Sequence, residues 1–434
     1  MFIQIHMLQS MPPGNLNRDD IGQPKKCIFG GVTRSRISSQ CQKRNIRLST
    51  EFKDAFGDAR TVRTTYLPRM VADELKEKRN GISEDDLKKI KDALAGKFKT
   101  EKGEAKKGEA EKGEAEKGEA EKGEAKKGEA EKDQTGQLVF FPPPFAKEIA
   151  NLILDLRDNK KDVFEAWVNG TKKEKVTHKE DKKHKKAIED AIEEFEKAMS
   201  EKSESLTVDI GMFGRMTTSD LVVNVEAACQ VAHAISTHEA IIESDYFTAM
   251  DDKNSEFAPT QTKKKAAGFM GAGETVTFFN SAVYYKYLNL DLDALKEHLS
   301  WKDNAAVENA ASVLVRAAAL ANPTGKQNSF AAHGIPELIL VEVSKTKRPI
   351  SYANAFLKPV DDVNLMTGSA KALSAYINTV AKAFAPADMR RVLMALGSAS
   401  VDAKIEEAKT VDTLDALVGS VVQLLKEVAH EQRP

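Results

Sequence analysis

The chain has 434 residues, and its 65 lysines and arginines nearly balance its 66 aspartates and glutamates, so the net charge of −1 excludes a uniformly basic or acidic protein. The cysteines Cys27, Cys41 and Cys229 are odd in number and irregularly spaced, which argues against a disulfide framework and a cysteine-based zinc site. The N-terminus does not resemble a leader, and no apolar run reaches the roughly 20 residues that a membrane span needs. We therefore expect a cytoplasmic protein without membrane contact.

The N-terminal segment predicts a strand followed by a helix. Residues 2–8 alternate apolar and polar side chains, which is typical of a half-buried strand, and turn residues at 10–15 end it. Ser38 or Ser39 is a suitable N-cap for a helix that reaches about Leu48.

Residues 61–205 predict a charged helical insertion. Lys-Gly-Glu-Ala occurs six times between Lys102 and Ala130. A glycine in every fifth position costs a helix roughly 1 kcal/mol each, and no side chain larger than alanine is available for burial. We expect residues 100–136 to form a flexible linker. Residues 172–202 predict one helix with Ile188, Ile192, Phe195 and Met199 on a single face.

The remainder predicts a packed α+β domain. Residues 205–216 suggest a strand that runs into a turn, residues 223–237 an apolar helix, and residues 251–273 a polar loop. The run at 276–290 is strongly β-prone. Further helices are expected at about 303–321, 369–384 and 412–429, with a strand at about 337–343. This order favours a small α+β sheet domain that carries the helical insertion.

Basic residues are concentrated near the N-terminus. Between Arg18 and Arg47, eight lysines and arginines oppose only two aspartates, Asp19 and Asp20, so the local balance is +6. Such clusters bind phosphate backbones, with help from hydroxyl and amide groups such as those of Ser38, Ser39 and Gln40. A solvated helix face next to a basic loop remains the alternative interpretation.

Two candidates for metal chemistry are weaker. Asp19 and Asp20 are paired carboxylates that could hold magnesium, but no third carboxylate is placed by the sequence, and a structural role is the favoured interpretation. His233 and His238 lie on a predicted helix, five residues apart, where metal ligands on one helix face would be four apart. A core or helix-end histidine is the simpler explanation.

Three further features each allow a functional and a structural interpretation. Gly325-Lys326 lacks the earlier glycine and the following hydroxyl residue of a phosphate-binding loop, which excludes that motif. Met216 and Phe279 are apolar residues beside polar or basic loops, where core packing is the common outcome. An apolar wedge between stacked bases is the functional alternative. No Ser/His/Asp or Cys/His set can be singled out by spacing.

Several motifs in one order carry a family resemblance. They are LNRDD at 16–20, IFGGxxRxRISSQxxKR at 28–44, GRMTTS at 214–219, AHAISTH at 232–238, DYFTAMDD at 245–252 and SYANAF at 351–356. Together they resemble the backbone (CasC-type) subunit of the type I-E CRISPR surveillance complex Cascade, a member of the RRM-like RAMP superfamily. The Lys-Gly-Glu-Ala insertion has no counterpart in that pattern.

The resemblance implies a palm with an RRM-like (ferredoxin-like) sheet and C-terminal helices at 1–60 and 206–434. It also implies a helical finger insertion at 61–205 and a thumb loop at 246–276. Copies would bind head to tail along one CRISPR RNA, kink it at intervals and present it for pairing with a target DNA strand. Other Cascade subunits would be partners. The resemblance implies no catalysis, cofactor or metal.

Site residues follow from motif position under the same resemblance. The guide phosphates would be contacted by Arg18, Lys25, Ser38, Gln40, Lys43 and Arg44. Met216 would be the residue wedged beside a displaced nucleotide, Phe279 would lie at the base of the thumb, and Lys263-Lys264-Lys265 is a further candidate contact in the thumb. Two alternatives stay open: an RNA-cutting backbone subunit that uses Asp19 or Asp20, as in related type III complexes, and a general RRM-like RNA-binding protein.

Overall fold

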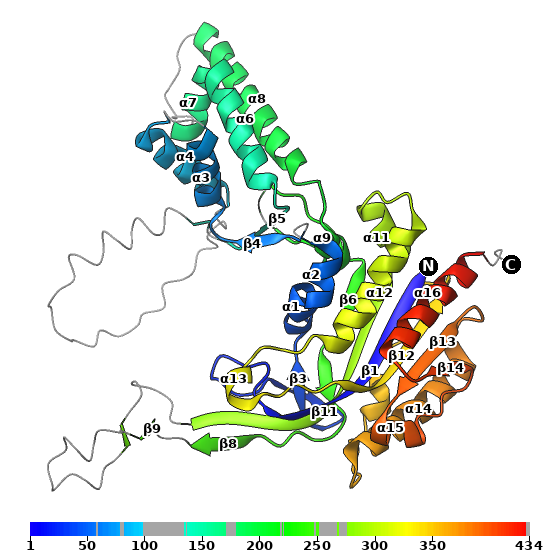
Figure 1. The fold of residues 1–434 in the computed structure, drawn as a ribbon. Helices are drawn as coiled ribbons and strands as arrows, with labels where there is room; N and C mark the ends of the chain where they lie inside the picture. Colours follow the sequence, from blue (N-terminus) through cyan, green and yellow to red (C-terminus); the bar gives the residue numbers. More distant parts are fainter. Residues whose placement is uncertain are drawn as a thin grey trace, which may run out of the picture. The chain divides into compact units, whose positions relative to one another are not determined.

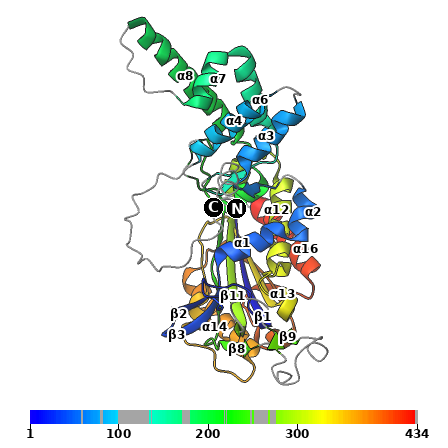
Figure 2. The same cartoon turned by 90° about the vertical axis from the view of Figure 1, so that its left-hand side faces the viewer.

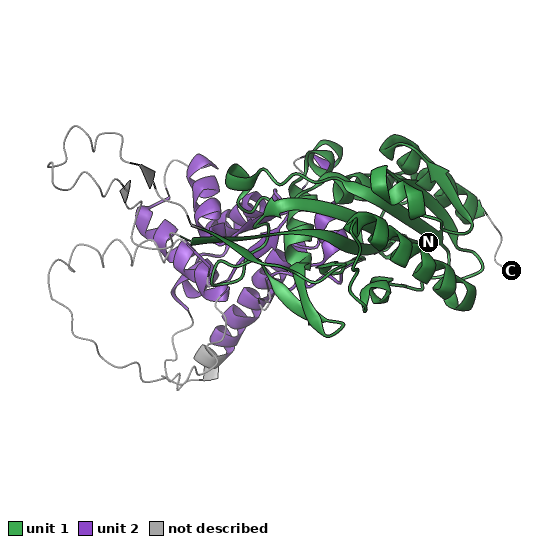
Figure 3. Ribbon diagram, turned by 90° about the horizontal axis from the view of Figure 1, so that it is seen from below, with its two compact units in different colours: residues 1–55, 228–434 green, residues 56–227 purple. Residues whose placement is uncertain are grey.

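The computed structural model divides the chain into two compact units (Figure 3). Unit 1 comprises residues 1–55 and 228–434, and unit 2 comprises residues 56–227. The described residues are 1–57, 60–78, 82–98, 134–135, 137–170, 179–217, 219, 221–246, 249–250, 267–268 and 276–430. Residues 206–227, which the sequence predicted to continue the palm, therefore fall in unit 2.

Unit 1 is built on a ten-stranded mixed sheet, whose main path runs β14-β13-β12-β1-β11-β7-β3-β2, with β6 and β8 also paired to β11. Its strands are β1 (Phe2–Gly14), β2 (Lys26–Phe29), β3 (Val32–Ile37), β6 (Cys229–Val231), β7 (Ala234–Ser236), β8 (Glu243–Tyr246), β11 (Val276–Asp291), β12 (Pro336–Ser344), β13 (Arg390–Ala395) and β14 (Ala408–Val411). The long strands β1, β11 and β12 lie side by side in Figure 1.

The centre of this sheet has ferredoxin-like topology. In chain order it consists of β1, helix α1 (Ser39–Leu48), the short strands β6 and β7, β11, helix α12 (Asn304–Leu320) and β12. In the sheet, β12, β1, β11 and β7 are neighbours, and each adjacent pair is antiparallel. This is the β-α-β-β-α-β arrangement with a strand order of 4-1-3-2. The predicted α+β fold with a ferredoxin-like sheet is confirmed.

Helices cover both faces of the sheet because successive strand residues point to opposite sides. On one face, Leu8 and Leu340 pack in one cluster with Leu373 and Ile377 of α14 (Leu365–Phe384). On the other face, α12 contacts β1, and α16 (Leu414–His430) contacts β12 and β13. Because helices cover both faces of the sheet, nearly all residues of β1 are buried.

Shorter elements complete unit 1. They are α2 (Thr50–Phe56, at the border with unit 2), α11 (Leu292–His298), α13 (Gln327–Phe330), η1 (Ala353–Phe356), α15 (Gly397–Asp402) and the strand pair β9 (Ala249–Met250) and β10 (Ala267–Gly268).

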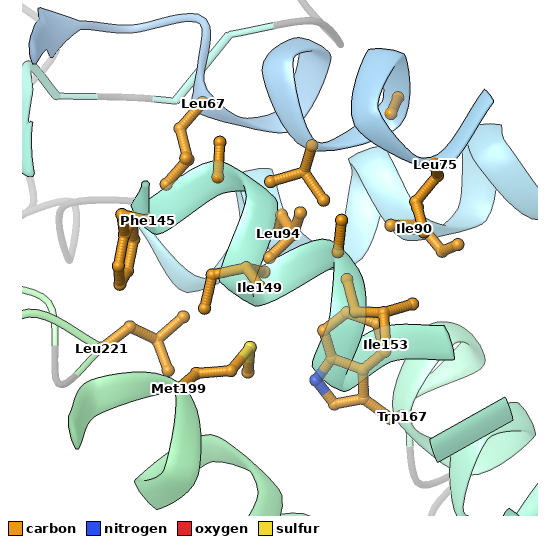
Figure 4. Packing of buried hydrophobic residues seen from close by; sticks show 14 of the residues in the cluster. Leu67, Leu75, Ile90, Leu94, Phe145, Ile149, Ile153, Trp167, Met199 and Leu221 are labelled. Carbon is orange, nitrogen blue, oxygen red and sulfur yellow. The ribbon is translucent and has the colours of Figure 1, made fainter. Parts of the chain in front are cut away.

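Unit 2 is mainly helical. Its elements are β4 (Val62–Thr64), α3 (Leu67–Lys78), α4 (Glu84–Lys97), β5 (Val139–Phe141), α6 (Phe145–Asn159), α7 (Lys161–Asn169), α8 (Lys179–Lys202) and α9 (Val208–Phe213). Figure 4 shows side chains from these helices in one hydrophobic core, among them Ile90, Ile153 and Trp167. Met199 and Phe195 of α8 are buried in it, as the periodicity of 172–202 predicted for that face.

Two predicted elements were wrong, and the turn predicted at 10–15 does not end the first strand, which continues to Gly14. Residues 205–216 form helix α9 and a turn instead of a strand, and residues 223–237 contain strands β6 and β7 instead of a helix. The second error has a physical reason: each strand is only three residues long and is held by pairing to β11, so its short apolar run could not be distinguished from a buried helix. Most of the predicted linker at 100–136 and most of the thumb predicted at 246–276 lie outside the described residues.

Candidate nucleic-acid interface

Helix α1 begins where strand β3 ends, and Ser38 fixes this junction. The Ser38 hydroxyl accepts a hydrogen bond from the backbone N–H of Cys41 at 3.3 Å, so Ser38, one of the two candidates from the sequence, is the N-cap. The Ser38 N–H in turn donates to the Asn17 side-chain oxygen at 2.8 Å. Ser38 is therefore buried, and it ties the loop around Asn17 to the start of α1.

Not all of the basic cluster is on the surface. Arg34 is fully buried, and its guanidinium donates to the carbonyl oxygens of Phe29, Ser236 and Phe356. Arg47 is also buried. The remaining basic residues are exposed or half-buried: Arg18, Lys25, Lys26, Arg36, Lys43 and Arg44. Gln40, in the first turn of α1, is exposed too.

Four of these cations lie on β3, on α1 or on the segment that is hydrogen-bonded to β3. The backbone N–H of Arg36 donates to the Lys25 carbonyl at 2.8 Å. Burial raises the pKa of the Cys41 thiol, while the positive charges of Arg44 and Lys25 act in the opposite direction, so both lie near it. Lys43 likewise acts against the burial that raises the pKa of Cys229 to about 12. Figure 2 shows α1, which carries Lys43 and Arg44, and β3, which carries Arg36; Lys25 directly precedes β2. We call Lys25, Arg36, Lys43 and Arg44 the α1 basic surface.

Asp19 closes a turn beside this surface. Its carboxylate accepts hydrogen bonds from the backbone N–H groups of Ile21 at 3.1 Å and Gln23 at 2.8 Å. The Lys25 N–H then donates to the Asn17 carbonyl at 2.9 Å, which places Lys25 next to Arg18 on the loop. These contacts support a structural role for Asp19.

A loop distant in the sequence approaches the same segment. A side chain at Gly325 would meet the carbonyl oxygen of Leu16 at 2.4 Å, so only glycine allows this close approach. Lys326 follows in the left-handed region, with φ of 53°. The sequence excluded a phosphate-binding loop here, and the spacing still does, but the fold brings Lys326 close to the segment that ends in Arg18.

Phe279 lies on β11 and packs against Phe330 of α13, with ring centroids 5.6 Å apart. Phe330 in turn packs against a cluster that contains Leu16 and Ile37. Through Phe330, Phe279 is therefore linked to Leu16 and Ile37, which lie close in the sequence to Arg18 and to the start of α1.

Met216 belongs to unit 2 and is 86 % exposed, which is unusual for a methionine. The preceding Arg215 is buried and donates to the carbonyl oxygens of Val223 at 2.8 Å and Ser203 at 3.0 Å. Burial lowers the pKa of Arg215 to about 10. The hydrogen bonds of Arg215 fix the backbone at this position, and the apolar side chain of Met216 is exposed to solvent.

Sequence reasoning missed three residues. Arg36 was counted in the cluster but not named as a contact, and Lys326 could not be connected to residues 15–18 without the fold. His233 was predicted to lie on a helix, yet it occupies the link between β6 and β7 with an exposed side chain. The only signal for His233 was its place in the AHAISTH motif.

Among the residues that the structure describes, no group of three or more histidines, cysteines, aspartates or glutamates is arranged to hold a metal ion. No helix in this part of the chain is long and apolar enough to cross a membrane.

The fold and the α1 basic surface define an α+β protein of the ferredoxin-like class with a candidate surface for phosphate groups. The chain belongs to the family described as CT1975-like protein, whose model matches residues 3–420. It is similar to a chain of a solved "CRISPR RNA-guided surveillance complex, pre-nicking", with 26 % identity, a TM-score of 0.69 and coverage of 98 % of this chain and 99 % of that chain.

A chain of a second "CRISPR RNA-guided surveillance complex" matches at 22 % identity and a TM-score of 0.62, with coverage of 98 % and 99 % respectively, and supports the fold alone. No curated protein matches the chain.

Proposed function

We propose that this protein is a non-catalytic structural subunit of a CRISPR surveillance complex and that it holds the backbone of the guide RNA. The observation that carries the proposal is the α1 basic surface, on a chain that is similar over 98 % of its length to one from an RNA-guided surveillance complex. Lysine and arginine clusters of this kind bind phosphates without reading sequence, which suits a subunit that must accept any guide.

Individual roles follow from the positions of the side chains. Lys25, Arg36, Lys43 and Arg44 contact phosphates directly, and Arg18, Gln40 and Lys326 extend this surface. Gln40 lies in the first turn of α1, where the positive end of the helix dipole also attracts an anion. Ser38 acts mainly by positioning, because its hydroxyl caps α1.

The finer assignment is to the backbone subunit of a type I-E Cascade complex in the cytoplasm. Unit 1 would be the palm, the helices of unit 2 the finger domain, and residues 246–276 the thumb. Copies of the chain bind head to tail on one guide, which then pairs with a target DNA strand beside other Cascade subunits. A heterologous interface of this kind extends into a filament. Met216 is the apolar wedge that kinks the guide, and Phe279 supports the thumb base.

The alternative of an RNA-cutting subunit is less well supported. Cleavage through Asp19 would require its carboxylate for a metal or a proton, whereas that carboxylate is engaged by two backbone N–H groups. Incubating the assembled complex with magnesium and an RNA complementary to the guide should leave that RNA intact. Cleavage that disappears in Asp20→Ala or Asp19→Asn would establish the alternative.

The direct experiment is to express the chain with a CRISPR array and its neighbouring subunits, purify it, and sequence the bound nucleic acid. Repeat-spacer RNA of uniform length in a particle with several copies of the chain is expected. Mixed cellular RNA would favour a general RRM-like RNA-binding protein, and a monomer without nucleic acid would contradict the proposal.

A further inference from the structure

His233 stands beside the α1 basic surface on a backbone held from two sides. The Ala232 carbonyl accepts a hydrogen bond from the Gln42 side chain of α1 at 2.8 Å. Two residues further along, Ile235 of β7 is paired with Arg36 of β3. The side chain of His233 is nevertheless exposed, so a fixed backbone presents a ring with an accessible edge.

The neighbour of the ring determines which nitrogen carries the proton. Nδ1 of His233 lies 2.7 Å from Nη1 of Arg36. A guanidinium can only donate, so Nδ1 accepts, and the proton of the neutral imidazole is on Nε2. Burial, and then the positive charges of Arg36 and Lys25, lower the pKa of His233, which favours this neutral form.

We propose that His233 is a further contact of the RNA backbone, whose Nε2–H donates to a phosphate oxygen held between Arg36 and Lys25. This inference rests on the proposed function, in which the α1 basic surface binds the guide RNA. The bond from Arg36 to Nδ1 orients both groups, so the imidazole and the guanidinium are positioned as a pair before RNA arrives.

A bound phosphate changes the electrostatics of the ring. The charged groups that act on His233 are Arg36 from β3 and Lys25 from the segment before β2, while α1 presents the neutral amide of Gln42 to the adjacent backbone. A phosphate counters both positive charges, so protonation of Nδ1, which replaces the hydrogen bond from Arg36 and frees that guanidinium for the phosphate, becomes more favourable in the complex than in the free protein. RNA binding is then coupled to proton uptake as the pH falls.

The test first measures the affinity of the purified chain for a guide-length RNA at pH 7.5 and at pH 5.5. It then measures the proton uptake that accompanies binding at pH 6, by calorimetry in two different buffers. The wild type should bind more tightly at the lower pH, by up to about tenfold if the pKa of His233 rises by one unit on binding. His233→Gln keeps an acceptor and a donor but cannot take up a proton. It should therefore bind like the wild type at pH 7.5 and lose the gain at pH 5.5.

His233→Ala removes the donor and should weaken binding about tenfold at pH 7.5, as expected for a hydrogen bond to a charged group, and by more at pH 5.5, where the gain from protonation is lost as well. His430→Gln, at the exposed end of α16, is the matched control and should keep the wild-type pH response. Equal proton uptake by wild type and His233→Gln would overturn the role of His233 while leaving RNA binding intact. An absence of RNA binding by the wild type at either pH would overturn the proposed function, and this inference with it.

Discussion

The side-chain ammonium group of Lys286 donates a hydrogen bond to the backbone carbonyl of Ala318, with the two atoms 2.8 Å apart. A second bond reaches the neutral side-chain oxygen of Gln9 at 3.1 Å. Lys286 is buried in β11 beneath α12, and this burial lowers its pKa from 10.5 to about 8. Among the described residues, the sheet of unit 1 therefore contains a buried lysine whose ammonium group is hydrogen-bonded to two uncharged oxygens.

This shift predicts a pH-dependent stability. Below pH 8 both states are protonated, and the buried charge costs the folded state about 3 kcal/mol, since one pKa unit corresponds to about 1.4 kcal/mol. Between pH 8 and 10.5 the unfolded chain keeps its proton while the folded chain loses it, so this contribution to the unfolding free energy rises with pH. Urea unfolding of the wild type and Lys286→Met across this range should show the difference between them change by about 3 kcal/mol.

The wild type must be compared with Lys286→Met because other buried groups lower the unfolding free energy as the pH rises. Burial raises the pKa of Tyr284 and of the Cys229 thiol, so these groups lower the stability of the folded state as the pH rises through their unfolded-state values. They are common to both proteins and cancel in the difference. A difference that is constant between pH 8 and 10.5 would show that Lys286 is not a buried cation.

The turn at Asp19 gives a second prediction. Asp19→Ala removes the acceptor for the N–H groups of Ile21 and Gln23 and should lower the unfolding free energy by about 1 to 2 kcal/mol. Asp19→Asn retains a side-chain oxygen and should stay close to the wild type, as should Asp20→Ala on the exposed neighbour. Chemical unfolding of the three variants measures this. An asparagine variant as unstable as the alanine variant would mean that the charge of Asp19, not its geometry, is required.

Arg215 and Met216 should behave in opposite ways although they are neighbours. Arg215→Met leaves the carbonyls of Val223 and Ser203 without their donor in the interior of unit 2 and should cost about 2 to 4 kcal/mol in thermal or urea unfolding. Met216→Ala changes an exposed side chain and should cost less than about 0.5 kcal/mol. If Met216→Ala proved strongly destabilising, the residue would be a packing residue and not an available wedge.

The sequence predicted the elements whose signals are local. Hydrogen-bonding chemistry within four residues narrowed the N-cap to Ser38 or Ser39, and the structure has it at Ser38. The strand β11 was predicted correctly because it is a long run of β-branched and aromatic side chains. Strands β6 and β7 exist because β11 pairs with them from more than 45 residues away, and such pairing leaves no local periodicity.

The candidate site shows the same limit. The number and sign of the basic residues could be counted in the sequence, but the burial of Arg34 could not be, because its acceptors Ser236 and Phe356 come from segments far along the chain. Charged residues are exposed by default, and the exceptions depend on tertiary partners. The pairing of Arg36 with His233 and the approach of Gly325 to Leu16 were unpredictable for the same reason.

The central claim is that the α1 basic surface holds the phosphates of the guide RNA. The measurement that tests it most directly is the affinity of the complex for repeat-spacer RNA across a range of salt concentrations, with a double variant, Lys43→Glu with Arg44→Glu. The matched control is Lys371→Glu with Lys409→Glu, which reverses two exposed charges on α14 and β14. Each phosphate contact on a single strand contributes about 0.7 to the slope of log affinity against log salt. We predict weaker binding to every guide and a slope that is less steep by about 1 to 2 for the first variant only. Equal slopes for the two variants and the wild type would remove Lys43 and Arg44 from the phosphate path and contradict the account.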